Sequence, residues 1–142
     1  MRTVRQLLDG KPSRLYTVDA DDPVRAAIQL MADHFIGALP VLRGGRLVGI
    51  VSERDYARKI LLMGRNSNET IVDTIMSAPV IQVEPHNTVN DCMQLMTEKR
   101  IRHLPVVENG QLIGVISIGD CVKAVMDEQR HEIEDLRRYI AG

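Results

Sequence analysis

Apolar residues recur at helical spacing in two parts of the chain. Positions i, i+3, i+4 and i+7 are apolar in each part: Val24, Ala27, Ile28 and Met31 in the first, and Val89, Cys92, Met93 and Met96 in the second. This spacing places the side chains on one face, so each part is predicted to be a helix with one buried stripe. Asp22, with Pro23 at the first helical position, is predicted to cap the first helix, and Asn87 the second.

Extended segments surround these helices. Apolar, β-branched runs flank the tetrapeptides at 43–46 (Arg-Gly-Gly-Arg) and 108–111 (Glu-Asn-Gly-Gln). Gly-Gly or Asn-Gly between two such runs is typical of a β-hairpin turn. A short extended run precedes each helix, at 15–18 and at 80–83, and a further helix is predicted after each hairpin. The predicted order is strand, helix, strand, strand, helix, twice over.

The order occurs twice because the sequence repeats itself. Residues 38–42 (ALPVL) return as 103–107 (HLPVV), an offset of 65, and the same offset carries 45–49 (GRLVG) onto 110–114 (GQLIG). No gap is needed between residues 18 and 61. Such ungapped self-similarity indicates a duplicated unit.

The duplication sets the predicted domain organisation. A unit of roughly 50–60 residues buries little core by itself, so the two units are expected to share one core about a pseudo-twofold axis. The predicted divisions are a first repeat at 1–64 with its N-terminal segment, a linker at 65–71, a second repeat at 72–126 and a C-terminal helical extension at 127–142.

The last predicted helix continues beyond the second repeat. It has a heptad-like seam with spacings of 3, 4, 3 and 4, at Met126, Gln129, Ile133, Leu136 and Ile140. Such a seam either packs on its own domain or meets a second subunit. We favour the second interpretation, and with it a homodimer, because the helix outruns the repeat that would cover it.

Composition narrows the function classes. The chain has 18 basic and 19 acidic side chains, which argues against a dedicated nucleic-acid binder because phosphate binding needs concentrated positive charge. Aromatic residues make up 3%, too few for platforms that stack single-stranded bases.

No apolar stretch is long enough to span a membrane and the first residues hold no apolar signal core, so a cytoplasmic location is expected. Cys92 and Cys121 are interpreted as core residues rather than redox or zinc sites.

A serine followed three residues later by an aspartate ends each predicted hairpin. Ser52-x-x-Asp55 and Ser117-x-x-Asp120 fit a capping box, in which the serine oxygen accepts a backbone N–H. They also fit nucleotide recognition, because an ionised aspartate can accept hydrogen bonds from both hydroxyls of a ribose, and a serine at a helix start suits a phosphate. The preceding Gly49 is interpreted as space for a ligand to approach the backbone. One residue can serve both as cap and as ligand contact, so the interpretations are compatible.

Two basic residues, Arg102 and His103, stand at the start of a predicted strand in the second repeat. They are interpreted either as a solvated rim or as a phosphate site, since arginine offers a planar fork and histidine can carry charge near neutral pH. Gly37 and Ala38 occupy the equivalent positions of the first repeat. The two repeats are therefore expected to differ electrostatically.

These motifs resemble those of a cystathionine-β-synthase-type (CBS) domain pair, also called a Bateman module. The doubled pattern of Leu-Pro-Val, a turn and G-x-x-S-x-x-D extends from about residue 15 to residue 126. The resemblance implies an α/β (α+β) fold of two tandem β-α-β-β-α repeats packed about a pseudo-twofold axis, here with an extended C-terminal helix. It also implies two clefts that bind adenosine-containing ligands such as AMP, ADP, ATP, NAD(H) or S-adenosylmethionine, a change of shape on binding, and disc-like dimers.

The resemblance also assigns residues to the clefts. The primary nucleotide-binding cleft is implied to contain Ser52, Asp55, Val80, Ile81, Arg102 and His103, with the aspartate on the ribose, the basic pair on the phosphates and the two apolar residues beside adenine. The second cleft is implied to contain Leu15, Tyr16, Ser117 and Asp120. Because it lacks the basic pair, it is expected to bind phosphate more weakly unless Arg54, Arg58 or Lys59 supplies charge. The alternative, favoured for Arg58 and Lys59, is that these are exposed helix residues.

The hypothesis from the sequence is a regulatory module that binds an adenine nucleotide and passes a conformational change to its dimer interface or to an effector protein. The alternative is a ligand-free dimerisation or docking scaffold, in which the serines and aspartates act only as caps. An enzyme is not expected, because no catalytic triad, P-loop or G-x-G-x-x-G motif can be identified. No metal, catalytic cofactor, nucleic acid or membrane partner is expected either.

Overall fold

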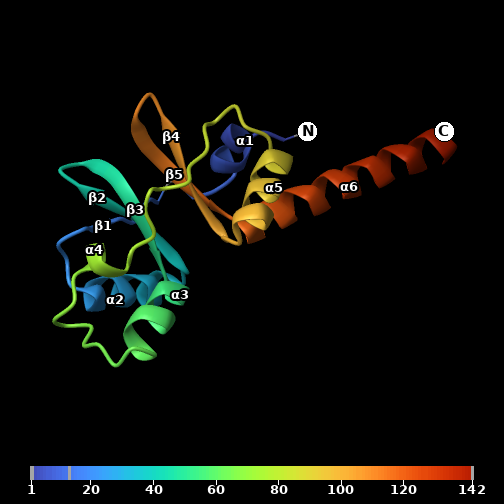
Figure 1. Cartoon of the computed structure of the whole chain (residues 1–142). Coiled ribbons are helices and arrows are strands. Elements are labelled where there is room, and N and C mark those ends of the chain that lie inside the picture. Colours follow the sequence, from blue (N-terminus) through green and yellow to red (C-terminus); the bar gives the residue numbers. More distant parts are fainter. Residues whose placement is uncertain (1, 13, 142) are drawn as a thin grey trace.

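The two hairpins, and the helices before and after each of them, follow the predicted order. Two short helices at 4–9 and 72–75 were not predicted, and the extended runs predicted at 15–18 and 80–83 are reduced to a two-residue strand at 18–19 and a single bridge at Val83. The computed structural model describes residues 2–12 and 14–141. In chain order the elements are α1 (Val4–Asp9), β1 (Val18–Asp19), α2 (Val24–His34), β2 (Ala38–Arg43), β3 (Arg46–Ser52), α3 (Glu53–Tyr56), the π-helix η1 (Ala57–Leu61), α4 (Val72–Ile75), α5 (Val89–Lys99), β4 (His103–Glu108), β5 (Gln111–Ser117) and α6 (Ile118–Ala141). They form a mixed α+β fold of two tandem repeats with a long C-terminal helix, as predicted (Figure 1).

The two hairpins keep the 65-residue offset in their register. The pairing runs from Ala38↔Ser52 to Arg43↔Arg46 in the first hairpin, and from His103↔Ser117 to Glu108↔Gln111 in the second. Both central residues of each turn have a positive φ, between 52° and 78°, as in the type I′ turn that matches the twist of the strands. A parallel neighbour joins each hairpin, at Val18↔Val41 in β1 and at the single bridge Val83↔Val106.

The predicted helix caps are wrong by one residue. Asp22 Oδ2 accepts a hydrogen bond from the Asp19 N–H at 3.0 Å, and Asn87 Oδ1 accepts one from the Glu84 N–H at 2.7 Å. Both side chains therefore close the turn that precedes the helix. The cap of α5 is Thr88, which forms a capping box, whereas a proline with ψ of 146° precedes α2 and makes no side-chain cap.

Two short helices pack in the core of the opposite repeat. α1 lies in the predicted first repeat, yet Val4 and Leu7 are buried in the core formed by α5, β4, β5 and α6. α4 lies in the predicted second repeat, yet Val72 and Ile75 are buried in the core formed by α2, β2 and β3. Figure 1 shows α1 beside the second hairpin and α4 beside the first. Each repeat therefore has a core of its own, so the expectation of one shared core is wrong, and the exchanged helices tie the two repeats together.

The packing of the exchanged helices explains why positions 49 and 114 hold glycine, which has no side chain. A Cβ on Gly49 would lie 2.6 Å from Met76 Sδ and 2.9 Å from the carbonyl oxygen of Ser77, and one on the equivalent Gly114 would lie 2.6 Å from Leu8 Cδ2. A real Cβ atom essentially never lies this close to a non-bonded atom, so a side chain at either position would displace its neighbour. Gly49 makes room for the residues directly after α4, and Gly114 makes room for α1 itself. This corrects the interpretation that Gly49 leaves space for a ligand.

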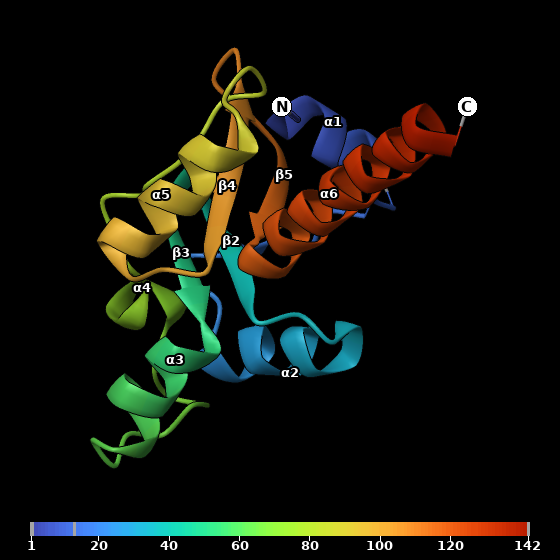
Figure 2. The ribbon, with the colours of Figure 1, turned by 90° about the vertical axis from the view of Figure 1, so that its right-hand side faces the viewer.

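Helix α6 leaves the body of the molecule. Its last buried residues are Cys121 and Ala124, and all residues of its outer part from 129 to 141 are exposed. Figure 1 shows the helix projecting away from both hairpins, and in Figure 2, turned by 90°, it points toward the viewer. The alternative that the predicted seam packs on its own domain is therefore wrong. Within the described residues, no helix is both long and apolar enough to cross a membrane.

The two cysteines lie in the core of the second repeat, as predicted. Cys92 and Cys121 are free and fully buried. Burial raises the pKa of the Cys92 thiol to about 12 and that of the Cys121 thiol to about 11. Both side chains are therefore protonated at neutral pH and act as small apolar residues.

Candidate ligand-binding site

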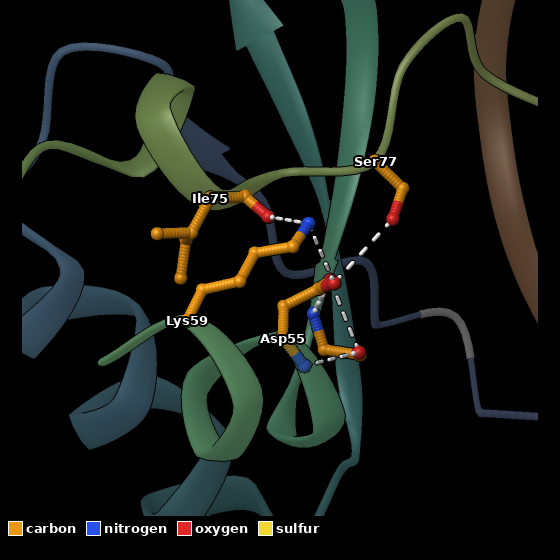
Figure 3. Close-up of polar contacts among 5 residues, drawn as sticks. Asp55, Lys59, Ile75 and Ser77 are labelled. Atoms are coloured by element: carbon orange, nitrogen blue, oxygen red, sulfur yellow. Dashed lines mark hydrogen bonds and ion pairs between the residues drawn. The ribbon is translucent and has the colours of Figure 1, made fainter. Parts of the chain in front are cut away.

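Asp55 is positioned at the junction of β3 and α3. Its Oδ2 accepts hydrogen bonds from the backbone N–H of Ser52 at 3.0 Å and from the Ser52 hydroxyl at 3.1 Å, while Ser52 Oγ accepts one from the Asp55 N–H at 3.2 Å. These bonds form the capping box that the sequence indicates. The other oxygen, Oδ1, lies 3.3 Å from Lys59 Nζ and accepts a hydrogen bond from Ser77 Oγ at 3.4 Å (Figure 3).

Lys59 connects this carboxylate to α4. Its ammonium group also donates a hydrogen bond to the carbonyl oxygen of Ile75 at 2.8 Å (Figure 3). Lys59 lies in η1 and Ile75 is the last residue of α4. The buried carboxylate of Asp55 is thus linked through one cation to the helix that packs across from the other repeat.

A cavity of about 310 Å³ opens beside Asp55. Basic side chains from both repeats line it: Arg54 and Arg58 of the first, and Arg100, Arg102 and His103 of the second. Arg54 Nη1 donates a hydrogen bond to the carbonyl oxygen of Arg100 at 3.2 Å, which joins the two walls. The acidic lining residues are Glu53 and Asp55. Basic groups outnumber acidic ones, so the cavity suits an anionic ligand with a hydroxyl-bearing end.

Four of the six residues predicted for the primary cleft line this cavity, namely Ser52, Asp55, Arg102 and His103. Val80 and Ile81 are not among the lining residues; both are half-buried, and Ile81 packs against the core of the second repeat. Ser77, from the same connecting segment, lines the cavity in their place. The role of Val80 and Ile81 beside adenine stays a prediction.

Sequence reasoning missed Ser77, and it offered Arg54 and Arg58 as charge for the second cleft although they line the first. Arg58 is exposed, as the favoured alternative expected. Arg54 lies directly before Asp55 in α3 and Arg58 lies three residues after it in η1, so both arginines line the same cavity as this aspartate. The internal repeat relates Ser77 to a residue in the other cavity. Its counterpart 65 residues earlier, Pro12, lines the second cavity.

The second cavity has a volume of about 500 Å³ and is lined by all four residues predicted for it: Leu15, Tyr16, Ser117 and Asp120. Asp120 repeats the capping box, since its Oδ2 accepts the Ser117 N–H at 2.8 Å and Ser117 Oγ accepts the Asp120 N–H at 3.1 Å. The positive charge in this cavity comes from Lys11 and Arg14, ahead of β1. The alternative that Arg54, Arg58 or Lys59 supplies charge here is therefore wrong, since none of the three lines this cavity.

Lys11 is paired with the carboxylate of the second cavity. Its Nζ lies 2.7 Å from Asp120 Oδ2 and donates a second hydrogen bond to the carbonyl oxygen of Val115 at 2.9 Å. Burial alone would raise the pKa of Asp120, but the hydrogen bonds from Lys11 and Ser117 and the charge of Lys11 bring that pKa below its ordinary value of 3.8. Asp120 is therefore ionised at neutral pH.

The ring of Tyr16 in the second cavity is held by an aromatic contact. It stacks on His34, the last residue of α2, with ring centroids 3.7 Å apart and an interplanar angle of 17°. Tyr16 also packs against the core of the first repeat. A ring fixed in this way offers a flat apolar wall to a ligand.

His103 forms part of the wall between the two cavities. It lines both, as do Gly37 and Ala38. A Cβ on Gly37 would lie 3.3 Å from His103 Cε1, so the absent side chain makes room for the imidazole. Burial lowers the pKa of His103 below its ordinary value of 6.5, the charges of Lys11 and Arg102 act in the same direction, and Asp120 opposes them. The imidazole is therefore neutral at pH 7 and stands between the two sites.

Comparison with known sequences gives the family. A family profile for the CBS domain matches residues 11–62 and again residues 72–127. The CBS domain-containing protein CBSX3 of Arabidopsis thaliana, named as mitochondrial, is 46% identical over 127 residues, which are 86% of this chain and 62% of that protein. The chain thus spans less than two thirds of the length of this relative.

Solved structures share the same arrangement. A signal-transduction protein with CBS domains from Burkholderia ambifaria is 53% identical and superposes with a TM-score of 0.86, over 89% of this chain and 96% of that one. The CBS domain pair of protein MJ0100, solved with 5′-methylthioadenosine and S-adenosyl-L-methionine, is 25% identical with a TM-score of 0.78, over 90% and 98% of the two chains. The duplicated profile match and the shared fold show that the chain belongs to the CBS domain family and carries two copies of the domain in tandem.

Proposed function

We propose that this chain is a regulatory module that binds an adenine nucleotide, of the AMP, ADP, ATP or NAD(H) type, and changes conformation in response. One observation carries the proposal: a buried carboxylate at a helix start and a cluster of basic side chains from the other repeat line the same cavity. A ribose with an anionic tail has the matching chemistry. Support comes from the MJ0100 domain pair, which was solved with two adenosine compounds.

The ribose end of the ligand is assigned to Asp55. Its Oδ2 is occupied by the Ser52 cap, so the ribose hydroxyls would donate to Oδ1, where Lys59 and Ser77 now bind. A ligand there competes with Lys59. Because Lys59 also holds the carbonyl of Ile75, ribose binding would loosen the link to α4.

The phosphates are assigned to Arg102 and His103, with Arg54, Arg58 and Arg100 near them. Several guanidinium groups favour a ligand with more than one phosphate, since each can pair with a different anionic oxygen. In the second cleft the cation nearest the aspartate is Lys11, which is already paired. We expect this cleft to prefer an adenosine ligand with less negative charge.

The proposed mechanism is a population shift. Each cavity is lined by residues of both repeats, so a bound ligand bridges them and favours one relative arrangement. A homodimer interface or an effector protein would sense that arrangement. The proposed role is binding and signalling, without a catalytic cofactor. The cytoplasmic location stays a prediction, and the Arabidopsis relative is named as mitochondrial.

A ligand-free docking scaffold is the second candidate. One observation favours it: Ser52, Asp55, Ser117 and Asp120 are all engaged in capping boxes, and each aspartate is paired with a lysine. In that case the polar groups would stabilise the helix starts and the clefts would stay empty.

A thermal-shift panel on purified, nucleotide-stripped protein separates the two candidates. The ligands are AMP, ADP, ATP, NAD, NADH, S-adenosylmethionine and GTP. A ligand present at one hundred times its dissociation constant adds about 2.7 kcal/mol to the free energy of unfolding, which raises the melting temperature measurably. A shift with adenine compounds and none with GTP supports the sensor. No shift at millimolar concentrations supports the scaffold.

A further inference from the structure

The predicted seam of α6 continues to the beginning of the helix. In a heptad frame the a and d positions are Gly119, Val122, Met126, Gln129, Ile133, Leu136 and Ile140. The large apolar side chains among them are exposed by 42% at Val122, 55% at Met126, 51% at Ile133, 61% at Leu136 and 82% at Ile140. Cys121 and Ala124, which face the core, fall on the other side of the helix. An exposed seam of three heptads is the pattern of a coiled coil whose partner helix is absent from the single chain.

We propose that the α6 helices of two copies of this chain pair in parallel as a two-stranded coiled coil. The proposal deepens the homodimer put forward above by naming the helix, the face and the orientation. Identical chains satisfy it because the seam is self-complementary about a twofold axis parallel to the helix.

The charges beside the seam select the parallel orientation. The e positions are all basic, at Lys123, Arg130 and Arg137, and the g positions are Ile118, Val125, Glu132 and Tyr139. In an antiparallel pair, e positions face e positions, which would bring basic side chains together. In a parallel pair, g positions face e positions five residues later, so Glu132 of one copy faces Arg137 of the second copy, twice by symmetry.

The length of α6 gives a second argument that this helix has a partner. Its 24 residues extend about 36 Å, and the outer part from 129 to 141 is exposed throughout. An isolated helix as short as this outer part is marginal in water without tertiary packing. The ion pairs Arg130–Asp127 at 3.8 Å, His131–Glu134 at 3.9 Å and Arg138–Asp135 at 4.0 Å are long and mostly exposed, so they add little. A partner helix on the seam supplies the missing apolar contact.

Disulfide trapping tests the proposal in the full chain. Position 136 is a d position, where the two helices of a parallel pair bring identical residues together. Leu136→Cys is oxidised mildly and run on a non-reducing gel, with Arg138→Cys, on the outward f position, as the matched control. Cys92 and Cys121 are buried and protonated, so they do not compete. We expect most of the Leu136→Cys protein, and little of the Arg138→Cys protein, to form covalent dimers.

The outcomes separate this proposal from the dimer itself. If sedimentation equilibrium gives a dimer but Leu136→Cys does not cross-link more than Arg138→Cys, the α6 proposal is overturned and the dimer remains. A monomer overturns both the α6 proposal and the homodimer.

A charge swap tests the orientation of the helices. Glu132→Arg is expected to raise the dimer dissociation constant several-fold, and the double variant with Arg137→Glu is expected to restore it. Failure of the double variant to restore dimerisation contradicts the parallel orientation.

Discussion

At the scale of single residues, the difference between the two repeats is concentrated at Arg102 and His103 and their counterparts Gly37 and Ala38. His103 occupies the space next to Gly37, and the three residues His103, Gly37 and Ala38 line both cavities. Equivalent residues of the two repeats meet here, and dense packing leaves room for a large side chain from one repeat only. The asymmetry visible in the sequence is therefore a packing requirement as well as an electrostatic one.

Replacing Arg102 by alanine is expected to weaken ATP binding by about 1.5 kcal/mol, the lower end for a charged hydrogen bond, because Arg102 is exposed and other arginines remain nearby. Binding of adenosine, which has no phosphate, should not change. Lys99→Ala serves as the control, since this exposed lysine at the end of α5 lines neither cavity. The dissociation constants are measured by titration calorimetry. Equal losses for ATP and adenosine would rule out phosphate contact.

His103 gives a pH dependence with a defined sign. Its pKa is lowered in the folded chain, mainly by burial and further by Lys11 and Arg102, so the unfolded chain binds the proton more readily. The contribution of neutral His103 to the free energy of unfolding is therefore fully present above pH 6.5, and it is lost as the pH falls below that value. Urea unfolding between about pH 5.5 and pH 8 should show this loss, and His103→Gln should reduce the slope. An unchanged slope in the variant would show that His103 does not titrate differently in the two states.

At the scale of elements, local patterns predicted what local interactions decide. Gly-Gly and Asn-Gly specified both hairpins, and the serine and aspartate motifs specified the starts of α3 and α6. The packing partners of α1 and α4 could not be predicted. Each helix is four to six residues long, and its place depends on contacts with segments far away in the sequence. The role of Gly49 was missed for the same reason, because Met76 reaches it only in the folded chain.

The two equivalent glycines make a matched pair of variants. Gly49→Ala is expected to destabilise the fold by roughly 1–3 kcal/mol, the usual cost of overpacking, because the new methyl group would meet the backbone carbonyl of Ser77 as well as Met76. Gly114→Ala should cost less, since it meets only the flexible end of Leu8. Urea unfolding of both variants checks the order. A Gly49→Ala protein as stable as the parent would contradict the account of α4 packing.

At the scale of the whole molecule, the two clefts share residues from both repeats and one common wall. The sequence predicted the aspartates and the basic pair of these clefts because the repeat makes them recognisable. It did not predict that Lys11 supplies the cation of the second cleft, because this residue precedes β1 and reaches Asp120 only through the fold. Arg54 and Arg58 were misplaced because sequence spacing does not reveal which cleft a helix start faces.

The central claim is that a nucleotide binds between Asp55 and the basic residues of the second repeat. It is tested most directly by titrating ATP into nucleotide-stripped protein in a calorimeter, with the parent chain and Asp55→Asn side by side. The asparagine keeps an acceptor for the Ser52 cap but loses the charge that binds Lys59 and the ribose. We predict saturable binding to the parent and clearly weaker binding to the variant, with both proteins folded. Equal affinity in the two proteins, or no heat of binding at millimolar ATP, would contradict the account.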